Sequence, residues 1–192
     1  ANVSIIRNLV NIDVEIKSYK SNQLKKIGLC GRFDYMKGID LAIDTLKLVK
    51  SRDIEIWCIG EGPLLKSLVD YLKNENIKYK SFGWLSKKDA VDKISEIDLL
   101  LFPSRCEGVP LTAIHAGILG IPFFGFNTIG TSLVYKPSSL VPAFNCDSMA
   151  ASIDLFLTKG VVDSEFLKNE YDKAFIHDLV TYKNEVKLAF SK

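Results

Sequence analysis

Short apolar runs alternate along this chain with longer segments in which apolar residues recur every three or four positions. The short runs have the length and the bounding glycines of buried strands, and the spacing in the longer segments predicts helices with one buried face. Strands are expected at residues 27–30, 54–59, 79–82, 99–102 and 122–126. Helices are expected between them at residues 39–49, 63–72, 86–94 and 111–119.

The two ends of the chain follow this pattern less closely. Residues 1–16 alternate only loosely and a polar stretch, 17–26, follows, so we expect a linker at 1–16 and one domain over 17–192. After residue 126 we expect a loop-rich passage, a short strand at 140–141, a helix at 149–157 and a long amphipathic helix at 170–190. Alternating strands and helices imply an α/β fold, a three-layer Rossmann-like parallel sheet with helices on both faces.

Composition and charge exclude several classes of protein. The 192 residues carry a formal net charge of +2, without a large basic region, so nucleic acid is not expected as a partner. The four cysteines are far apart, and three lie in or beside apolar runs, which predicts buried reduced thiols in a cytoplasmic protein. Neither a signal peptide nor an apolar run long enough for a membrane span is present, and no residues have metal-ligand spacing.

The first candidate site lies in residues 102–120, where a predicted buried strand leads through a loop into a helix. Ligands bind at such junctions in α/β sheets, because strand ends and unpaired helix N–H groups converge there. Glu107, beside Gly108, can accept hydrogen bonds from two sugar hydroxyls, and His115 is one turn into the helix, within reach of a second ring. The alternatives are a solvated loop acid for Glu107 and a half-buried packing residue for His115.

A second candidate site follows the first strand, where Gly31 and Arg32 are close in sequence to Lys37. Beside a helix N-terminus these cations would form a diphosphate clamp, although solvated surface charges are an alternative interpretation. Residues 60–63, Gly-Glu-Gly-Pro, predict a tight turn with Pro63 at the first position of the next helix. The dinucleotide motif G-x-G-x-x-G and the hydrolase motif G-x-S-x-G are both absent from the expected positions, which disfavours those two functions.

Taken in this order, these motifs resemble the C-terminal, nucleotide-sugar-binding domain of retaining GT-B glycosyltransferases, family 4 in particular. The resemblance rests on Gly31-Arg32, Lys37-Gly38, residues 59–63, Phe82-Gly83, Asp98 and residues 102–104 with Glu107-Gly108. It covers the chain nearly end to end. Residues 6–11 resemble the hinge between the two domains of such enzymes, so we expect the donor-binding half of an enzyme cut at its hinge.

The resemblance also implies roles for individual residues. Three would be catalytic: Arg32, Lys37 and Glu107. The donor-binding residues would be Gly31, Gly60, Trp84, Leu85, Glu107, Gly108, Val109, Pro110, Leu111 and His115. No metal or other cofactor is implied. The implied partners are a nucleotide sugar and the missing N-terminal acceptor domain, with peripheral association of the full-length enzyme at the inner face of a membrane. Its implied role is transfer of a hexose in polysaccharide or glycolipid assembly.

Two positions depart from the family's pattern. His115 stands where the family usually has a second glutamate that holds the ribose, and residues 130–133 stand where paired glycines and an acid are common. The alternatives that remain open are a degenerate module acting in protein association, half of a nucleotide-sugar epimerase, and a plain flavodoxin-like domain. By the same resemblance the helix at 170–190 would pack on the missing domain, which predicts either self-association of this chain or a frayed C-terminus.

Overall fold

The computed structural model describes residues 25–132, 135 and 140–159 of the 192-residue chain. The linker expected at 1–16 and the helix expected at 170–190 lie outside the described residues.

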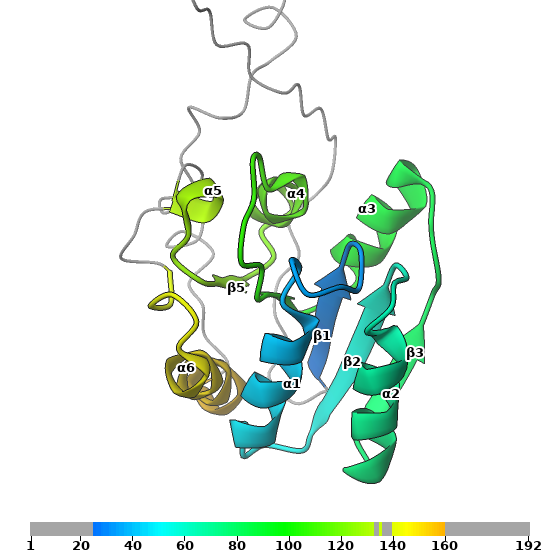
Figure 1. The fold of residues 1–192 in the computed structure, drawn as a ribbon, viewed down its shortest axis with the longest axis vertical. Coiled ribbons are helices and arrows are strands. Elements are labelled where there is room, and N and C mark those ends of the chain that lie inside the picture. Colours follow the sequence, from blue (N-terminus) through cyan, green and yellow to red (C-terminus); the bar gives the residue numbers. More distant parts are fainter. Residues whose placement is uncertain (1–24, 133–134, 136–139, 160–192) are drawn as a thin grey trace, which may run out of the picture.

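The centre of the fold is a five-stranded parallel sheet with the strand order β3-β2-β1-β4-β5 (Figure 1). Every strand pairing is parallel. The strands are β1 (Lys25–Cys30), β2 (Ile54–Ile59), β3 (Lys78–Ser81), β4 (Leu99–Phe102) and β5 (Phe123–Gly125). This arrangement confirms the parallel sheet expected from the alternating pattern.

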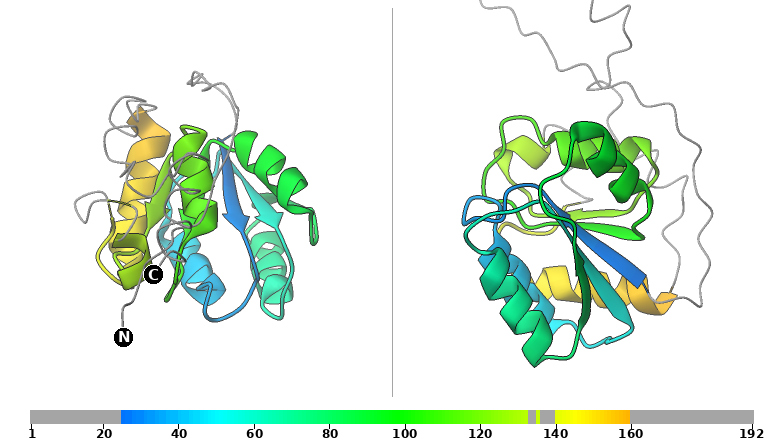
Figure 2. Two further views of the ribbon diagram at one scale, coloured as in Figure 1. Left: turned by 90° about the horizontal axis from the view of Figure 1, so that it is seen from above. Right: turned by 90° about the vertical axis from the view of Figure 1, so that its right-hand side faces the viewer.

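Helices cover both faces of the sheet, which makes three layers (Figure 2). On one face lie α1 (Ile39–Leu48), α2 (Leu65–Asn74) and α6 (Cys146–Lys159), and on the other lie α3 (Lys87–Ser95) and α4 (Leu111–Ile118). A one-turn helix, α5 (Ile129–Ser132), follows β5. The three-layer Rossmann-like expectation is therefore confirmed.

The strand β4 shows why the sheet must be covered on both sides. All four of its residues are buried. Leu99 and Leu101 join the core beneath α1, α2 and α6, whereas Leu100 and Phe102 join the core beneath α3 and α4. Because side chains alternate across a strand, an uninterrupted apolar run requires apolar neighbours on both faces.

Polar residues extend the sheet beyond the apolar run at its first strand. The expected polar connector reached residue 26, but β1 begins at Lys25. The Lys25 N–H donates to Asp53 O at 3.1 Å, and the Lys26 N–H donates to the Asp98 carboxylate at 2.8 Å. Backbone hydrogen bonds outweigh side-chain polarity here, so the prediction was wrong for these two residues.

Two turns also differ from expectation. Pro63 does not occupy the first position of a helix: it lies in a turn, and α2 begins at Leu65. The expected strand at 140–141 reduces to one bridge between Val141 and Phe126. The passage expected to be loop-rich contains the short helix α5.

The helix α6 starts three residues earlier than the apolar spacing indicated. The side chain of Asn145 accepts a hydrogen bond from the Ser148 N–H at 2.8 Å, so it caps the helix N-terminus. A capping residue fixes a helix start that periodicity alone leaves open.

The four cysteines are free thiols. Cys58 is buried, and burial raises its pKa to about 12. Cys30 and Cys146 are only half-buried and Cys106 is exposed, so full burial was predicted correctly for Cys58 alone. Within the described residues, none of the helices has the length and apolarity needed to span a bilayer.

Candidate functional site

The candidate site lies where the strand order reverses. From β1 the chain moves outward to β2 and β3, then returns to β4 on the other side of β1 and continues to β5. Because the connections from β1 and β4 leave in opposite directions, a crevice opens at the carboxyl ends of these two strands. The loops that carry Lys37 and Glu107 follow these strands directly.

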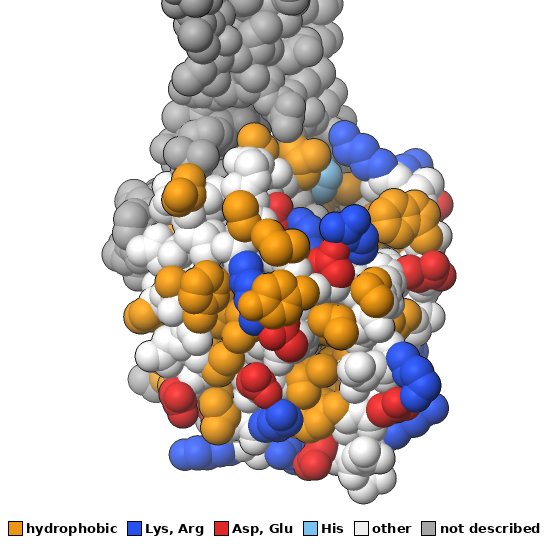
Figure 3. Space-filling model, viewed as in Figure 1, with side chains coloured by type: hydrophobic (Ala, Val, Ile, Leu, Met, Phe, Trp, Pro, Cys, Tyr) orange, Lys and Arg blue, Asp and Glu red, His pale blue; other side chains and the backbone are white. Residues whose placement is uncertain are grey.

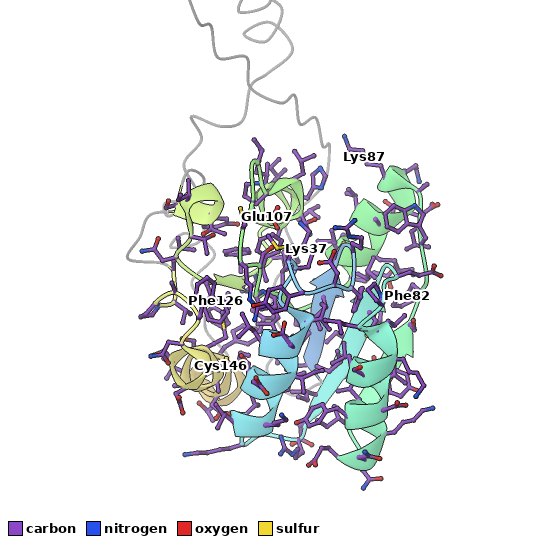
Figure 4. The ribbon with its side chains drawn as sticks, in the orientation of Figure 1. Lys37, Phe82, Lys87, Glu107, Phe126 and Cys146 are labelled. Atoms are coloured by element: carbon purple, nitrogen blue, oxygen red, sulfur yellow. The ribbon has the colours of Figure 1, made fainter. Side chains whose placement is uncertain are left out.

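Lys37 and Glu107 meet in this crevice, although 70 positions separate them in sequence (Figure 4). Lys37 Nζ donates to Glu107 Oε1 at 2.6 Å. The Ser104 hydroxyl donates to the same carboxylate oxygen. The Glu107 side chain is only 9% exposed, so its carboxylate is held in place and is not a freely solvated loop acid.

Glycines allow the loops of the site to approach one another. Gly38 has a left-handed φ of 68°, and a Cβ atom there would lie 1.9 Å from Pro103 O. Gly60 has a φ of 130°, and a Cβ atom would lie 2.0 Å from Gly31 O. Glycine at these positions therefore lets the turns after β1, β2 and β4 come together around one crevice.

Arg32 lines the same small pocket as Gly31, Lys37 and Ser104. Its side chain is 67% exposed and forms an ion pair with Asp34. Asp34 in turn accepts a hydrogen bond from the Lys37 N–H at 2.9 Å. The two cations proposed for a diphosphate thus lie on one loop, with Lys37 facing Glu107 and Arg32 facing solvent.

The N-terminus of α4 stands beside Glu107 without a capping side chain. Pro110 is buried and has no N–H, and the Leu111 N–H donates to Val109 O at 2.9 Å. In the described part of the chain, the N–H groups of Gly108 and Val109 make no hydrogen bond. These exposed N–H groups and the helix dipole favour an anion or a sugar hydroxyl at this point.

Trp84 and Leu85 lie at the neighbouring part of the crevice, after β3. They follow Gly83, which pairs with Gly60 in an antiparallel bridge. The Trp84 side chain is 72% exposed, whereas Leu85 packs against the core beneath α3 and α4. The structure therefore brings this stretch next to the turn after β2.

His115 is buried on α4, with only 6% of its surface exposed. Burial, and to a smaller extent the positive charge of Lys87 at the start of α3, lowers the pKa of His115 (Figure 4 labels Lys87). The imidazole is consequently neutral near pH 7, with one donor and one acceptor nitrogen. Figure 3 shows the histidine colour on this face beside Lys and Arg side chains.

The lowered pKa of His115 predicts a pH dependence of stability. The unfolded chain takes up the proton near the ordinary value of 6.5, before the folded chain does, so the free energy of unfolding falls as the pH drops below that value. When the pH is lowered from about 7 to about 5, we expect the free energy of unfolding to fall less in His115→Gln than in the parent. Urea denaturation at both pH values measures this; equal losses in the two proteins would contradict it.

The contribution of Lys87 can be measured by NMR titration of the imidazole. Lys87→Ala is expected to raise the pKa of His115 toward its ordinary value, because one repelling charge is removed. Lys88→Ala is the matched control, since Lys88 is the next residue and is paired with Asp92 at 2.9 Å.

Sequence reasoning did not foresee three contacts in and around this crevice. Ser104 lies within a motif that was recognised, but its bond to Glu107 was not foreseen. Arg105 binds Asp40 with both terminal nitrogens, at 2.7 and 2.6 Å. Gly130 of α5 packs so closely that a Cβ atom would lie 2.3 Å from Glu107 O. Ser104 had a sequence signal in its place between Pro103 and Glu107, and Gly130 had one in the departure noted at residues 130–133, whereas Arg105 had none.

The described residues contain no group of three His, Cys, Asp or Glu side chains that could hold a metal ion. The expectation of a metal-free site stays a prediction, and the cations at hand are Arg32 and Lys37.

The family described as Glycosyl transferases group 1 matches residues 24–159. An uncharacterized 41.2 kDa protein in the cps region of Klebsiella pneumoniae is 28% identical over 134 residues, which are 65% of this chain and 36% of that protein. The O-antigen biosynthesis glycosyltransferase WclY of Escherichia coli is 31% identical over 100 residues, 52% of this chain and 28% of that protein. The chain thus spans about a third of the length of these relatives.

Two solved structures share the fold. The lipopolysaccharide outer core galactosyltransferase WaaB, in its apo form, has a TM-score of 0.79 at 21% identity, covering 98% of this chain and 55% of that one. The TarM G117R mutant of S. aureus, in a complex that includes UDP, also has a TM-score of 0.79, at 22% identity. The match covers 97% of this chain and 38% of that one. The chain therefore has the Rossmann-like fold found in GT-B glycosyltransferases.

Proposed function

This chain belongs to the family Glycosyl transferases group 1, and from that premise we propose that its crevice binds the nucleotide-sugar donor of a retaining enzyme of family 4. The observation that carries the proposal is the contact between Lys37 and Glu107 at the carboxyl ends of β1 and β4. A cation suited to phosphate and a carboxylate suited to sugar hydroxyls thus lie within one crevice, which supports the proposal.

The donor's diphosphate binds Lys37 and Arg32. A lysine is a movable point charge and an arginine a planar fork, so together they reach oxygens of both phosphates. When Lys37 turns to the phosphates, Glu107 is released to accept from sugar hydroxyls, while Ser104 still holds one of its oxygens. As the nucleoside diphosphate leaves, the two cations and the N–H groups at α4 offset its developing charge, the electrostatic work that a metal ion does in other enzymes.

The nucleoside lies toward Trp84, Leu85 and His115. Backbone beside Trp84 and Leu85 flanks the base, and His115 faces the ribose. A glutamate in place of His115 would accept from both ribose hydroxyls, whereas the neutral imidazole offers one acceptor and one donor. The ribose is therefore held by one accepted and one donated hydrogen bond.

The biological role that we propose is transfer of a hexose in polysaccharide or glycolipid assembly. The O-antigen function in the name of WclY supports it, and the UDP in the TarM complex supports a nucleotide-sugar donor. The acceptor binds a further domain that closes over the crevice, and the complete enzyme works in the cytoplasm at the inner face of a membrane.

Calorimetric titration of the 192-residue chain with UDP, GDP and ADP tests the proposal. We expect one nucleotide to bind selectively, and Arg32→Ala to weaken it about fivefold, because an exposed charge contributes modestly. The chain alone is expected to transfer little sugar, since the acceptor site belongs to the further domain.

Three outcomes would count against the proposal. Binding of none of the nucleotides would favour a module that acts in protein association. Binding that is unchanged in Arg32→Ala would remove Arg32 from the site. Robust sugar transfer by this chain would contradict the proposal that the acceptor binds a further domain.

A further inference from the structure

We propose that Arg105 is a positioning residue that fixes Lys37 opposite Glu107, so that nucleotide binding depends on a residue that does not touch the nucleotide. The inference rests on the proposed function. It arises from the contacts of one side chain that bridges the loop after β1 and the loop after β4.

Arg105 holds the chain on both sides of Lys37. Before Lys37, its Nη1 donates to Tyr35 O at 2.6 Å and its backbone N–H donates to Met36 O at 2.9 Å. After Lys37, its two terminal nitrogens bind the two carboxylate oxygens of Asp40, at 2.7 and 2.6 Å. Lys37 therefore lies on a short segment that is fastened at both ends to the same arginine.

Arg105 is also fixed relative to Glu107, which follows two residues later in the same loop. Its guanidinium carbon lies 3.7 Å from the centroid of the Tyr35 ring, and its side chain is only 17% exposed. The hydroxyl of Ser104, the preceding residue, lies between Glu107, to which it donates its proton, and Met36 O, at 3.3 Å. Arg105 and the adjacent Ser104 thus fix the positions of both Lys37 and Glu107.

The ion pair between Arg105 and Asp40 differs from the ion pair between Lys37 and Glu107 that it supports. Lys37 must leave Glu107 when a diphosphate arrives, whereas Arg105 and Asp40 do not face the small pocket and can stay paired throughout. The Arg105 guanidinium holds the pKa of Asp40 below its ordinary range, so this pair stays charged well below neutral pH. A bidentate arginine pair that also binds a backbone carbonyl needs the planar fork, which lysine lacks.

A double-mutant cycle between Arg105 and Lys37 tests the proposal through UDP affinity. We expect Arg105→Ala to weaken binding about fivefold, and Lys37→Ala to cost about thirtyfold in the parent but only about fivefold once Arg105 is absent. A role in stability alone would leave the cost of Lys37→Ala unchanged. Arg105→Lys should not restore affinity, and Asp40→Asn should weaken binding in the same direction as Arg105→Ala but less, since the bond to Tyr35 O remains.

Asp44→Asn is the matched control, because it breaks the pair between Asp44 and Lys47 at 2.8 Å on the same helix, away from the crevice. UDP affinity in Arg105→Ala within twofold of Asp44→Asn, or an additive cycle, would overturn the positioning role while the proposed function stands. Failure of the parent chain to bind UDP, GDP or ADP would overturn both.

Discussion

Lys37→Ala is expected to weaken UDP binding about thirtyfold, the largest loss of affinity for any single side chain of the crevice. Its side chain is 32% exposed, and its ammonium group lies in the crevice, 2.6 Å from Glu107 Oε1. A charge-assisted hydrogen bond to phosphate in such a site is worth about 2 kcal/mol, which corresponds to that factor. Calorimetry measures the affinity, and Lys47→Ala on the exposed side of α1 is the control.

Glu107, the partner of Lys37, allows a second test of the same hypothesis, in which the affinity for UDP is expected to rise. In the free chain Glu107 competes with the diphosphate for Lys37 and repels it by its own charge. We therefore expect Glu107→Gln to strengthen binding of UDP a few-fold while it weakens the preference for a UDP-sugar over UDP. A loss of UDP affinity in Glu107→Gln equal to that in Lys37→Ala would show that the pair serves structure and not the donor.

Gly38→Ala is expected to lower the free energy of unfolding by about 3 kcal/mol. The left-handed φ of 68° alone costs a residue with a side chain about 1 to 2 kcal/mol. The remainder comes from the new Cβ atom, which would lie 1.9 Å from the backbone oxygen of Pro103. Because that oxygen is part of the backbone, the loops after β1 and β4 must separate, and nucleotide affinity should fall as well.

Gly108→Ala provides the contrast for this prediction. No atom lies within 4 Å of a Cβ atom at Gly108, and its φ is not in the left-handed region. We expect it to change the free energy of unfolding by less than about 0.5 kcal/mol. Urea denaturation compares the two variants, and equal losses would mean that loop contact between Gly38 and Pro103 does not limit stability.

The sequence by itself determined the elements whose signals are local. The strand β4 was predicted at its observed bounds because an uninterrupted apolar run leaves no other register. The helix expected at 86–94 is α3, and its start is fixed by a local contact, the hydrogen bond from the Asp89 N–H to the Ser86 hydroxyl at 3.2 Å. The sequence also singled out Arg32, Lys37 and Glu107 as candidates, since the order of strand, loop and helix marks where ligands bind, and their roles stay predictions.

Only the tertiary structure decided how these pieces act on one another. The order β3-β2-β1-β4-β5 places two loops, 70 positions apart, at one crevice, and no local pattern encodes that order. The ion pair between Arg105 and Asp40 and the position of Lys87 near His115 were also decided by the tertiary structure. The sequence does not show which of the many other polar residues each of these side chains will lie beside. Local interactions select strands and helices, but distant side chains meet only after the whole core has packed, and the geometry of the site is fixed at that stage.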